Sequence, residues 1–348
     1  MQLKAACKKY TLQFLRPAGT SRGIYTTKDS WFIFLSDQGK TGIGECSLLK
    51  DLSYDDRPGF ENKLKRVCTE INSGTFNFEE SLYEFPAIRF GLETALLDFQ
   101  NGGNHILFPS DFTQGKAGIV TNGLIWMGDK TYMREQISAK LRLGFSCIKL
   151  KIGALDWNTE QEIITEMRRQ FNTDDLTIRV DANGAFSFEQ APEVLSALAE
   201  MRVHSIEQPI KAGHWEQMAE LCSTTPTPIA LDEELIGIFP ESKKKELLET
   251  IRPQYLILKP GLLGGFSACD EWISLANEMQ TGWWVTSALE SNIGLNAISQ
   301  WVFTKDVSTA QGLGTGLLFS NNIGSPLTLT GEKLFYEPAK SWDHIEPE

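Results

Sequence analysis

The chain has 348 residues, of which 41% are hydrophobic and 22% charged, and this balance is typical of a folded globular protein. Its net charge of −12 argues against binding to nucleic acid or to an anionic membrane surface. The N-terminus lacks the apolar stretch of a signal peptide, and no apolar run approaches the roughly 18 residues of a membrane span. The six cysteines are widely spaced without a C-x-x-C pair, so we expect free thiols and a cytoplasmic protein.

The first hundred residues predict strands followed by helices. An apolar strand over residues 30–35 is followed by a turn at 37–40 and by a returning strand over 41–46, which together predict a hairpin. Residues 86–99 have helical periodicity, and the segment Asn101–Asn104 is typical of a break. We therefore expect an α+β unit over residues 1–115.

From about Gly118 onward, short apolar runs alternate with amphipathic stretches that favour helices. The polar residues that close these runs recur about every 25–30 residues, which is the length of one strand, one helix and two loops. The pattern predicts a β/α barrel over residues 116–319. An open, doubly wound sheet is the alternative, but no glycine-rich phosphate fingerprint follows the first strand. The expected strands cover residues 119–124, 147–152, 177–180, 205–206, 229–231, 255–258 and 284–286.

Six charged residues lie directly after five of these runs or just inside them. Because barrel active sites form at the carboxyl ends of the strands, we expect these side chains to converge. Charges scattered by chance at strand ends are the simpler explanation for any one of them, but not for six residues in five successive units. The residues are Lys149, Lys151, Asp181, Glu207, Asp232 and Lys259.

Asp181, Glu207 and Asp232 come from three consecutive strands. Three carboxylates brought close together repel one another unless a cation lies among them. Oxygen ligands of this kind suit Mg²⁺, with Mn²⁺ as the alternative ion. Glu233 and Glu234 compete with Asp232 for the third position, and we prefer Asp232 because it ends the apolar run.

Lys149 and Lys151 are two residues apart in an apolar strand, so both side chains lie on the same face. At an effective dielectric of about 20, two ammonium groups about 4 Å apart repel by roughly 4 kcal/mol. This corresponds to about three pKa units as an upper bound, since the carboxylates oppose it. We therefore expect a lysine of lowered pKa that can act as a base, with Lys259 facing the pair across the barrel.

Together these motifs resemble the enolase superfamily, and within it the muconate-lactonizing subgroup. The resemblance is carried by Lys-x-Lys at 149–151, Asp-Ala-Asn at 181–183, Glu-Gln-Pro at 207–209, Leu-Asp-Glu at 231–233 and Lys-Pro at 259–260. Segments 42–47, 85–97, 287–295 and 312–313 extend it over nearly the whole chain, toward the family of o-succinylbenzoate synthases. The resemblance implies a (β/α)7β TIM-like barrel, with an α+β capping domain that residues from about 320 to 348 complete.

The resemblance also implies roles for individual residues. Lys151 would remove a proton next to a carboxylate and then return it to the departing hydroxyl, through an enediolate stabilised by Mg²⁺. Lys149 would hold the substrate carboxylate, and Lys259 would stabilise the intermediate as a cation–π partner. The loops at 20–23 and 47–49 would close over the site. The other implied substrate contacts are Ser287, Gly312, Arg22 and Asn183.

Several functions remain open from the sequence. The resemblance favours syn-dehydration of 2-succinyl-6-hydroxy-2,4-cyclohexadiene-1-carboxylate in menaquinone biosynthesis, by a carbon–oxygen lyase. An N-acylamino-acid racemase could use Lys151 and Lys259 as opposed bases, and a muconate cycloisomerase is a further relative. Dipeptide epimerases carry an Asp-x-Asp where this chain reads Gly312-Leu313-Gly314. A non-catalytic anion-binding barrel is the alternative from another class. The expected partner is a small carboxylate, and a homo-oligomer is left open.

Overall fold

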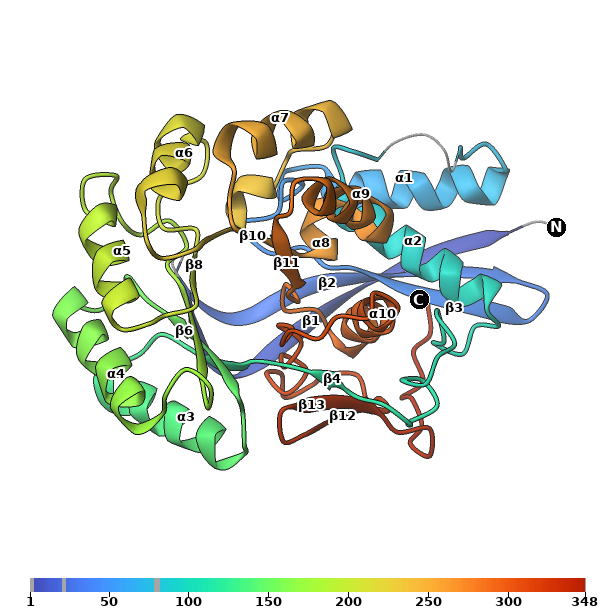
Figure 1. The fold of residues 1–348 in the computed structure, drawn as a ribbon. Helices are drawn as coiled ribbons and strands as arrows, with labels where there is room; N and C mark the ends of the chain where they lie inside the picture. Colours follow the sequence, from blue (N-terminus) through green and yellow to red (C-terminus); the bar gives the residue numbers. More distant parts are fainter. Residues whose placement is uncertain (1–2, 21–22, 78–81, 348) are drawn as a thin grey trace.

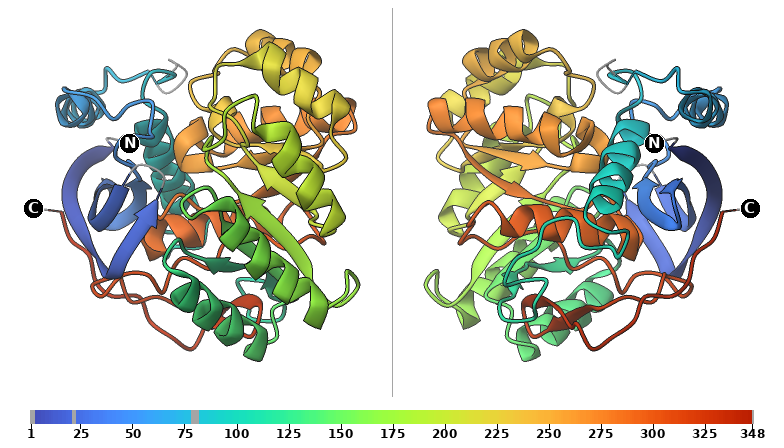
Figure 2. Two further views of the ribbon diagram at one scale, coloured as in Figure 1. Left: turned by 90° about the vertical axis from the view of Figure 1, so that its left-hand side faces the viewer. Right: turned by 90° about the vertical axis from the view of Figure 1, so that its right-hand side faces the viewer.

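The computed structural model describes residues 3–20, 23–77 and 82–347. A curled sheet of seven parallel strands carries helices on its outer side, and a long antiparallel sheet with two helices lies against it (Figures 1 and 2). This arrangement confirms the predicted β/α barrel with an α+β unit beside it. Among the described residues, none of the helices has the length and apolar character required to span a bilayer.

The barrel strands follow one another in sequence order, and each pairs in parallel with the next. They are β5 (Gly123–Ile125), β6 (Cys147–Lys151), β7 (Thr177–Asp181), β8 (Ser205–Glu207), β9 (Ile229–Leu231), β10 (Tyr255–Leu258) and β11 (Gly282–Val285). The outer helices are α3 (Lys130–Arg142), α4 (Trp157–Gln170), α5 (Ala191–Glu200), α6 (Trp215–Thr224), α7 (Glu241–Ile251), α9 (Gly265–Glu278) and α10 (Asn292–Phe303). Two short turns, η1 (Glu233–Leu235) and α8 (Pro260–Leu263), follow β9 and β10.

Residues 311 and 312 close the barrel. Gln311 forms a parallel bridge with Thr121, and Gly312 forms one with Thr286 at the end of β11. Backbone hydrogen bonds from Gly312 N to Val285 O (2.7 Å) and from Asn122 N to Gln311 O (2.9 Å) continue the ladder on both sides. The segment therefore takes the place of an eighth strand, and its backbone lies at the mouth of the barrel.

The N-terminal unit, called the cap below, comprises β1 (Lys4–Thr20), β2 (Gly23–Asp37), β3 (Lys40–Cys46), α1 (Phe60–Ser73) and α2 (Pro86–Gln100). The predicted turn between β2 and β3 is confirmed, with Gln38 and Gly39 both at positive φ, as a two-residue hairpin requires. A Cβ at Gly44 would lie 2.0 Å from the Gly91 carbonyl oxygen, so only glycine lets β3 pack this closely on α2.

The expected strand over 119–124 is divided in the structure. β4 (Ile119–Val120) leaves the barrel and pairs with a C-terminal hairpin of β12 (Leu327–Thr330) and β13 (Lys333–Tyr336), whereas β5 pairs with β6. Beyond this hairpin, Trp342 and Ile345 pack against Phe32 and Phe34 of the cap sheet. The C-terminal residues therefore contact both the barrel and the cap.

Candidate active site

The register of the parallel strands brings the charged strand ends to one level. Lys151 on β6 pairs with Asp181 on β7, and Asp181 pairs with Glu207 on β8. Asp232 follows β9, the next strand, and Lys259 follows β10. These ends therefore meet at the carboxyl-terminal face of the barrel, where side chains from different strands can act on one substrate.

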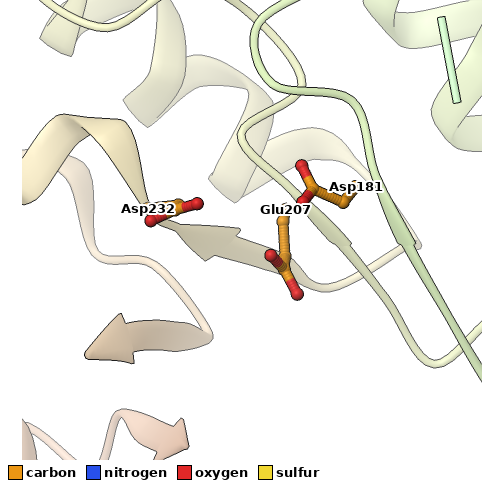
Figure 3. A group of neighbouring side chains, drawn as sticks. All are labelled: Asp181, Glu207 and Asp232. Atoms are coloured by element: carbon orange, nitrogen blue, oxygen red, sulfur yellow. The ribbon is translucent and has the colours of Figure 1, made fainter. Parts of the chain in front are cut away.

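Asp181, Glu207 and Asp232 form a compact group of buried carboxylates (Figure 3). One carboxylate oxygen of each lies within 4.8 Å of the corresponding oxygens of the other two. Oε1 of Glu207 is buried and accepts no hydrogen bond from the described residues, so it is available as a ligand. Three hard oxygen donors fit a divalent cation such as Mg²⁺, Mn²⁺ or Ca²⁺.

Three lysines surround these carboxylates. Nζ of Lys149 lies 2.9 Å from Oδ2 of Asp181 and 2.5 Å from Oε2 of Glu207. Nζ of Lys151 lies 2.9 Å from the same Asp181 oxygen and donates to Oδ1 of Asn183 at 2.6 Å. Lys259 forms an ion pair with Asp232. All three lysines and Asn183 line one cavity at the mouth of the barrel.

The lowered pKa expected for one lysine of the pair does not belong to Lys149, whose pKa is raised like that of Lys259. Burial disfavours both ammonium groups, but carboxylates outweigh it and raise both pKa values, chiefly Asp181 and Glu207 for Lys149 and Asp232 for Lys259. The predicted repulsion between lysines is the weaker effect at Lys149, because carboxylate oxygens of Asp181 and Glu207 lie within 2.9 Å of its ammonium group.

The carboxylates respond differently to the same surroundings. Burial opposes ionisation of Asp181, but Lys149, Lys151 and Lys259 together hold its pKa well below the usual range. Burial raises the pKa of Glu207 to about 7, because Lys149 only partly offsets it and the neighbouring acids oppose ionisation. A divalent cation in this group would favour the ionised form of every carboxylate that it touches.

The remaining predicted contacts lie mostly on the same cavity. Ser287 and Gly312 both line it, and Oγ of Ser287 shares a hydrogen bond of 2.5 Å with Oγ1 of Thr315. Leu49, from the predicted cap loop, lines it as well. Arg22 lies outside the described residues. Glu233 accepts a hydrogen bond from Nδ2 of Asn183 at 2.9 Å, which places it beside the carboxylate group.

Sequence reasoning missed several cavity residues. Asn122 and Thr286 both line the cavity. Thr286 directly follows β11, so the rule that found the lysines could also have found it, whereas Asn122 precedes β5 and falls outside that rule. Apart from Leu124 on β5, the apolar wall has no comparable signal, because its members come from the cap and from loops. This wall includes Tyr25, Leu49, Leu52, Leu124, Trp126 and Leu289.

Comparisons with known proteins agree with this geometry. Residues 132–316 match the family model described as "Enolase C-terminal domain-like". The o-succinylbenzoate synthase of Desulfotalea psychrophila is 45% identical over an alignment that covers 94% of this chain and 98% of the relative.

Solved structures of related proteins also resemble this chain. The crystal structure of MenC from Desulfotalea psychrophila has a TM-score of 0.86 and 41% identity, and the match covers 96% of this chain and 100% of that one. The L-Ala-D/L-Glu epimerase of Bacillus subtilis has a TM-score of 0.82 at 19% identity, covering 98% of both chains, and shares the fold. With its barrel, its capping sheet and its carboxylate group at the strand ends, the chain belongs to the enolase superfamily.

Proposed function

We propose that this chain is an o-succinylbenzoate synthase. The enzyme is a hydro-lyase that removes water from 2-succinyl-6-hydroxy-2,4-cyclohexadiene-1-carboxylate to give o-succinylbenzoate, in menaquinone biosynthesis. The observation that carries the proposal is 45% identity to an o-succinylbenzoate synthase over nearly the full length of both chains. Its named relatives among the epimerases and racemases are far less similar, at 22–25% identity.

We infer that Lys151 is the base. Its Nζ is engaged by Asp181 and Asn183, which leaves one of its three N–H directions for the cavity. In neutral form, Lys151 would take the proton from the carbon next to the carboxylate, and the ring electrons would shift toward that carboxylate. The same group, now protonated, would give its proton to the departing hydroxyl as the C–O bond breaks. One water leaves, the ring becomes aromatic, and Lys151 is neutral again.

We infer that Lys149 and Lys259 act electrostatically. Lys149 lies between two of the carboxylates and would contribute positive charge where the substrate carboxylate binds. Lys259, from β10, would face the ring from the side opposite Lys151 and stabilise it as it becomes electron-rich. We propose Mg²⁺ for the group of Asp181, Glu207 and Asp232; when bound, it supplies charge for the carboxylate of the substrate.

We also propose how the chain is divided. Residues 1–115, completed by about 320–348, would form the capping domain, and residues 116–319 would form the barrel that carries the chemistry. Ser287 and Gly312 would contact the succinyl carboxylate. A cytoplasmic location is supported by six cysteines that are all free thiols.

Three substrate classes test the proposal. Purified enzyme saturated with Mg²⁺ is assayed on the cyclohexadiene precursor, an N-succinyl amino acid and a dipeptide. We expect the precursor to have the highest kcat/KM, because residues 312–314 contain no carboxylate that could hold the ammonium group of a dipeptide. A higher kcat/KM for either of the other two classes would refute the assignment and leave the superfamily unchanged.

A further inference from the structure

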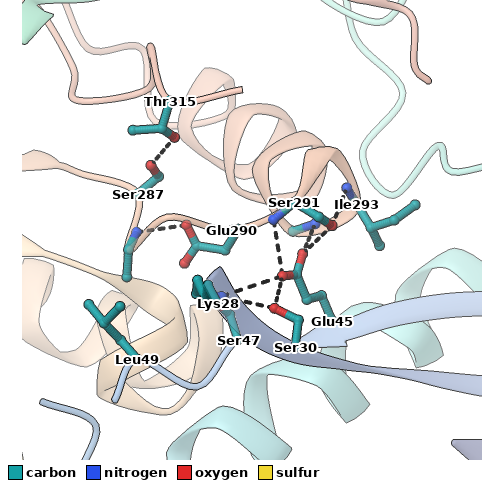
Figure 4. Close-up of polar contacts among 12 residues, drawn as sticks. Lys28, Ser30, Glu45, Ser47, Leu49, Ser287, Glu290, Ser291, Ile293 and Thr315 are labelled. Atoms are coloured by element: carbon teal, nitrogen blue, oxygen red, sulfur yellow. Dashed lines mark hydrogen bonds and ion pairs between the residues drawn. The ribbon is translucent and has the colours of Figure 1, made fainter. Parts of the chain in front are cut away.

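A second group of buried charges lies behind the active site, where the cap meets the barrel (Figure 4). Lys28 on β2 is 5% exposed, and Glu45 on β3 and Glu290 in the loop after β11 are fully buried. Nζ of Lys28 donates to Ser30 Oγ and Ser47 Oγ, both at 2.9 Å, and lies 3.8 Å from Oε1 of Glu45. None of the three charged side chains lines the active-site cavity.

Glu45 fastens the cap to the barrel. Its carboxylate accepts hydrogen bonds from Ser30 Oγ (2.7 Å), from N and Oγ of Ser291 (3.0 and 2.6 Å) and from Gly294 N (3.0 Å). The last two residues form the amino end of α10, where unpaired N–H groups favour an anion. A Cβ at Gly294 would lie 2.9 Å from Oε2 of Glu45, so the contact also requires a glycine there.

Glu290 completes the group from the barrel side. Its Oε2 accepts from Ala288 N at 2.6 Å, and its Oε1 has no hydrogen-bond partner among the described residues. Burial raises the pKa of Glu290 to about 7, and Lys28 only partly opposes this. Lys28 is thus the cation that makes two buried acids tolerable, and removing it would leave them facing each other without a counter-charge.

The same contacts hold two loops that form the cavity wall. Ser47 begins the cap loop (residues 47–53), in which Leu49 and Leu52 line the cavity. The barrel loop (residues 286–291) contributes Ser287, Ala288 and Leu289 to the cavity, and Leu49 packs against the cluster that contains Leu289. The charged group therefore supports both loops from behind, while their apolar side chains line the cavity.

Leu289 gives an independent sign that the barrel loop is held under constraint. Its φ of 63° is a left-handed conformation that an L-residue adopts only at a cost of about 1–3 kcal/mol. Such a conformation persists where neighbouring contacts fix it. Here Glu290 accepts a hydrogen bond from Ala288 N, one residue before Leu289. Glu45 accepts one from Ser291 N, two residues after Leu289.

We propose that Lys28 is a positioning residue for substrate binding, which locks the cap loop onto the barrel loop and so fixes Leu49 and Leu289 as one wall of the cavity. The proposal rests on the proposed function for the identity of the substrate only. It differs from a purely structural role, because it requires loss of Lys28 to change how the substrate binds as well as how stable the fold is.

The test compares Lys28→Met with a matched variant, Lys244→Met. Lys244 is also buried, at 1% exposed; it donates to Ala268 O at 3.1 Å and pairs with Glu271 at 2.6 Å, between α7 and α9 and outside the cavity. We expect both variants to have a lower Tm. Only Lys28→Met should raise KM, by about tenfold or more as for a lost apolar contact, with kcat within about threefold of the parent.

Two further variants keep the test decisive. In Lys28→Met/Glu290→Gln, one of the two facing acids is removed, so KM should recover toward the parental value. If Lys28→Met does not fold, Ser47→Ala removes one Lys28 acceptor in the cap loop and should raise KM about threefold or more. If Lys28→Met folds and its KM is unchanged, the proposal is overturned. If Lys28→Met does not fold, an unchanged KM in Ser47→Ala overturns it. An equal rise of KM in Lys244→Met overturns it as well.

The same measurements separate the two proposals. A parent enzyme that does not turn over the cyclohexadiene precursor contradicts the proposed function alone. The KM comparison is then made on whichever carboxylate the parent does use, and it bears on Lys28 as before.

Discussion

Asn183 and Gln208 have left-handed backbones, with φ of 45° and 40°. Asn183 lies two residues after Asp181, and Gln208 directly follows Glu207. Side-chain contacts explain why this strain persists. Asn183 accepts from Lys151 and donates to Glu233, whereas Oε1 of Gln208 accepts from the backbone N–H groups of Asp232 and Glu234 (both 3.2 Å). The two strained residues thus hold Lys151, the proposed base, and Asp232 in place, as expected of strain at a functional site.

Replacing Lys151 tests the assignment of the base. Lys151→Ala should reduce kcat by at least about 10²–10⁴-fold, because one amine would serve both proton transfers. Binding of Mn²⁺, followed by calorimetry, should persist, since the three carboxylates remain. Lys243→Ala, at an exposed residue paired with Glu246, is the control and should retain parental rates. Near-parental turnover in Lys151→Ala combined with an inert Lys149→Ala would reverse the two roles.

Neighbouring acids allow a sharp test of the metal group. Asp232 offers an oxygen within 4.8 Å of those of Asp181 and Glu207, whereas Oε1 of Glu233 is engaged by Asn183. Asp232→Asn should weaken Mn²⁺ binding at least about tenfold, and Glu233→Gln should change it by less. Calorimetric titration of both variants against the parent measures this directly. The opposite order would assign the third ligand to Glu233.

At the scale of elements, a carboxylate on α2 of the cap binds the amino end of the barrel helix α9. The carboxylate of Glu93 accepts from the backbone N–H groups of Phe266 and Ser267 (3.0 Å for the latter), in the first turn of α9. A Cβ at Gly265 would lie 2.1 Å from Oε2 of Glu93, so the glycine leaves room for this contact. An acid here satisfies N–H groups that a helix start otherwise leaves unpaired.

Removal of this contact should loosen the cap from the barrel. Glu93→Ala is expected to lower the free energy of unfolding by about 1–3 kcal/mol, the range for losing hydrogen bonds to a buried charge. Urea unfolding of the variant and the parent measures the difference. Glu246→Ala, which removes only an exposed ion pair with Lys243, should stay within about 0.5 kcal/mol. Equal stabilities for Glu93→Ala and the parent would show that the contact contributes nothing.

The elements that the sequence predicted correctly are those that a pattern of neighbouring residues specifies. The alternation around Cys147–Ile152 predicted two lysines on one face, and the turn at 37–40 predicted the β2–β3 hairpin. Residues 86–99 predicted α2, but no local pattern relates Glu93 to Ser267, which follows it by 174 residues. The C-terminal hairpin was missed because its strands are only four residues long, and only β13 pairs with β4, over two residues.

At the scale of the whole molecule, contacts with other parts of the chain fix the cap loop at both ends. Ser47 is bound by Lys28 at one end. At the other end, Oδ2 of Asp55 accepts from Ala87 N (3.0 Å) in the first turn of α2, and Tyr54 packs on Phe239 of the barrel with ring centroids 5.0 Å apart. The wall of the cavity is therefore part of the tertiary packing between cap and barrel, which is why no short sequence motif reports it.

We expect Asp55 to make this packing sensitive to pH. Its carboxyl is fully buried, and Oδ1 has no hydrogen-bond partner among the described residues. Burial raises its pKa to about 7, above the ordinary 3.8. An acid whose pKa is raised by folding binds its proton more tightly in the folded state. The contribution of this carboxyl to the free energy of unfolding is therefore most favourable below pH 3.8, and it is lost as the pH rises toward 7.

Asp55→Asn removes this titration while keeping the hydrogen bond to Ala87 N. Relative to the parent, the variant should gain stability as the pH rises from 5 to 7, by up to about 1.4 kcal/mol per pH unit, and the gain should level off above 7. Urea unfolding at pH 5, 6, 7 and 8 gives the profile, and subtracting the parental profile cancels the other titrating groups. Asp111→Asn, at an exposed residue, should change stability little at any pH. A constant difference between Asp55→Asn and the parent would mean that Asp55 does not titrate in this range, so that contacts other than its proton fix the cap loop.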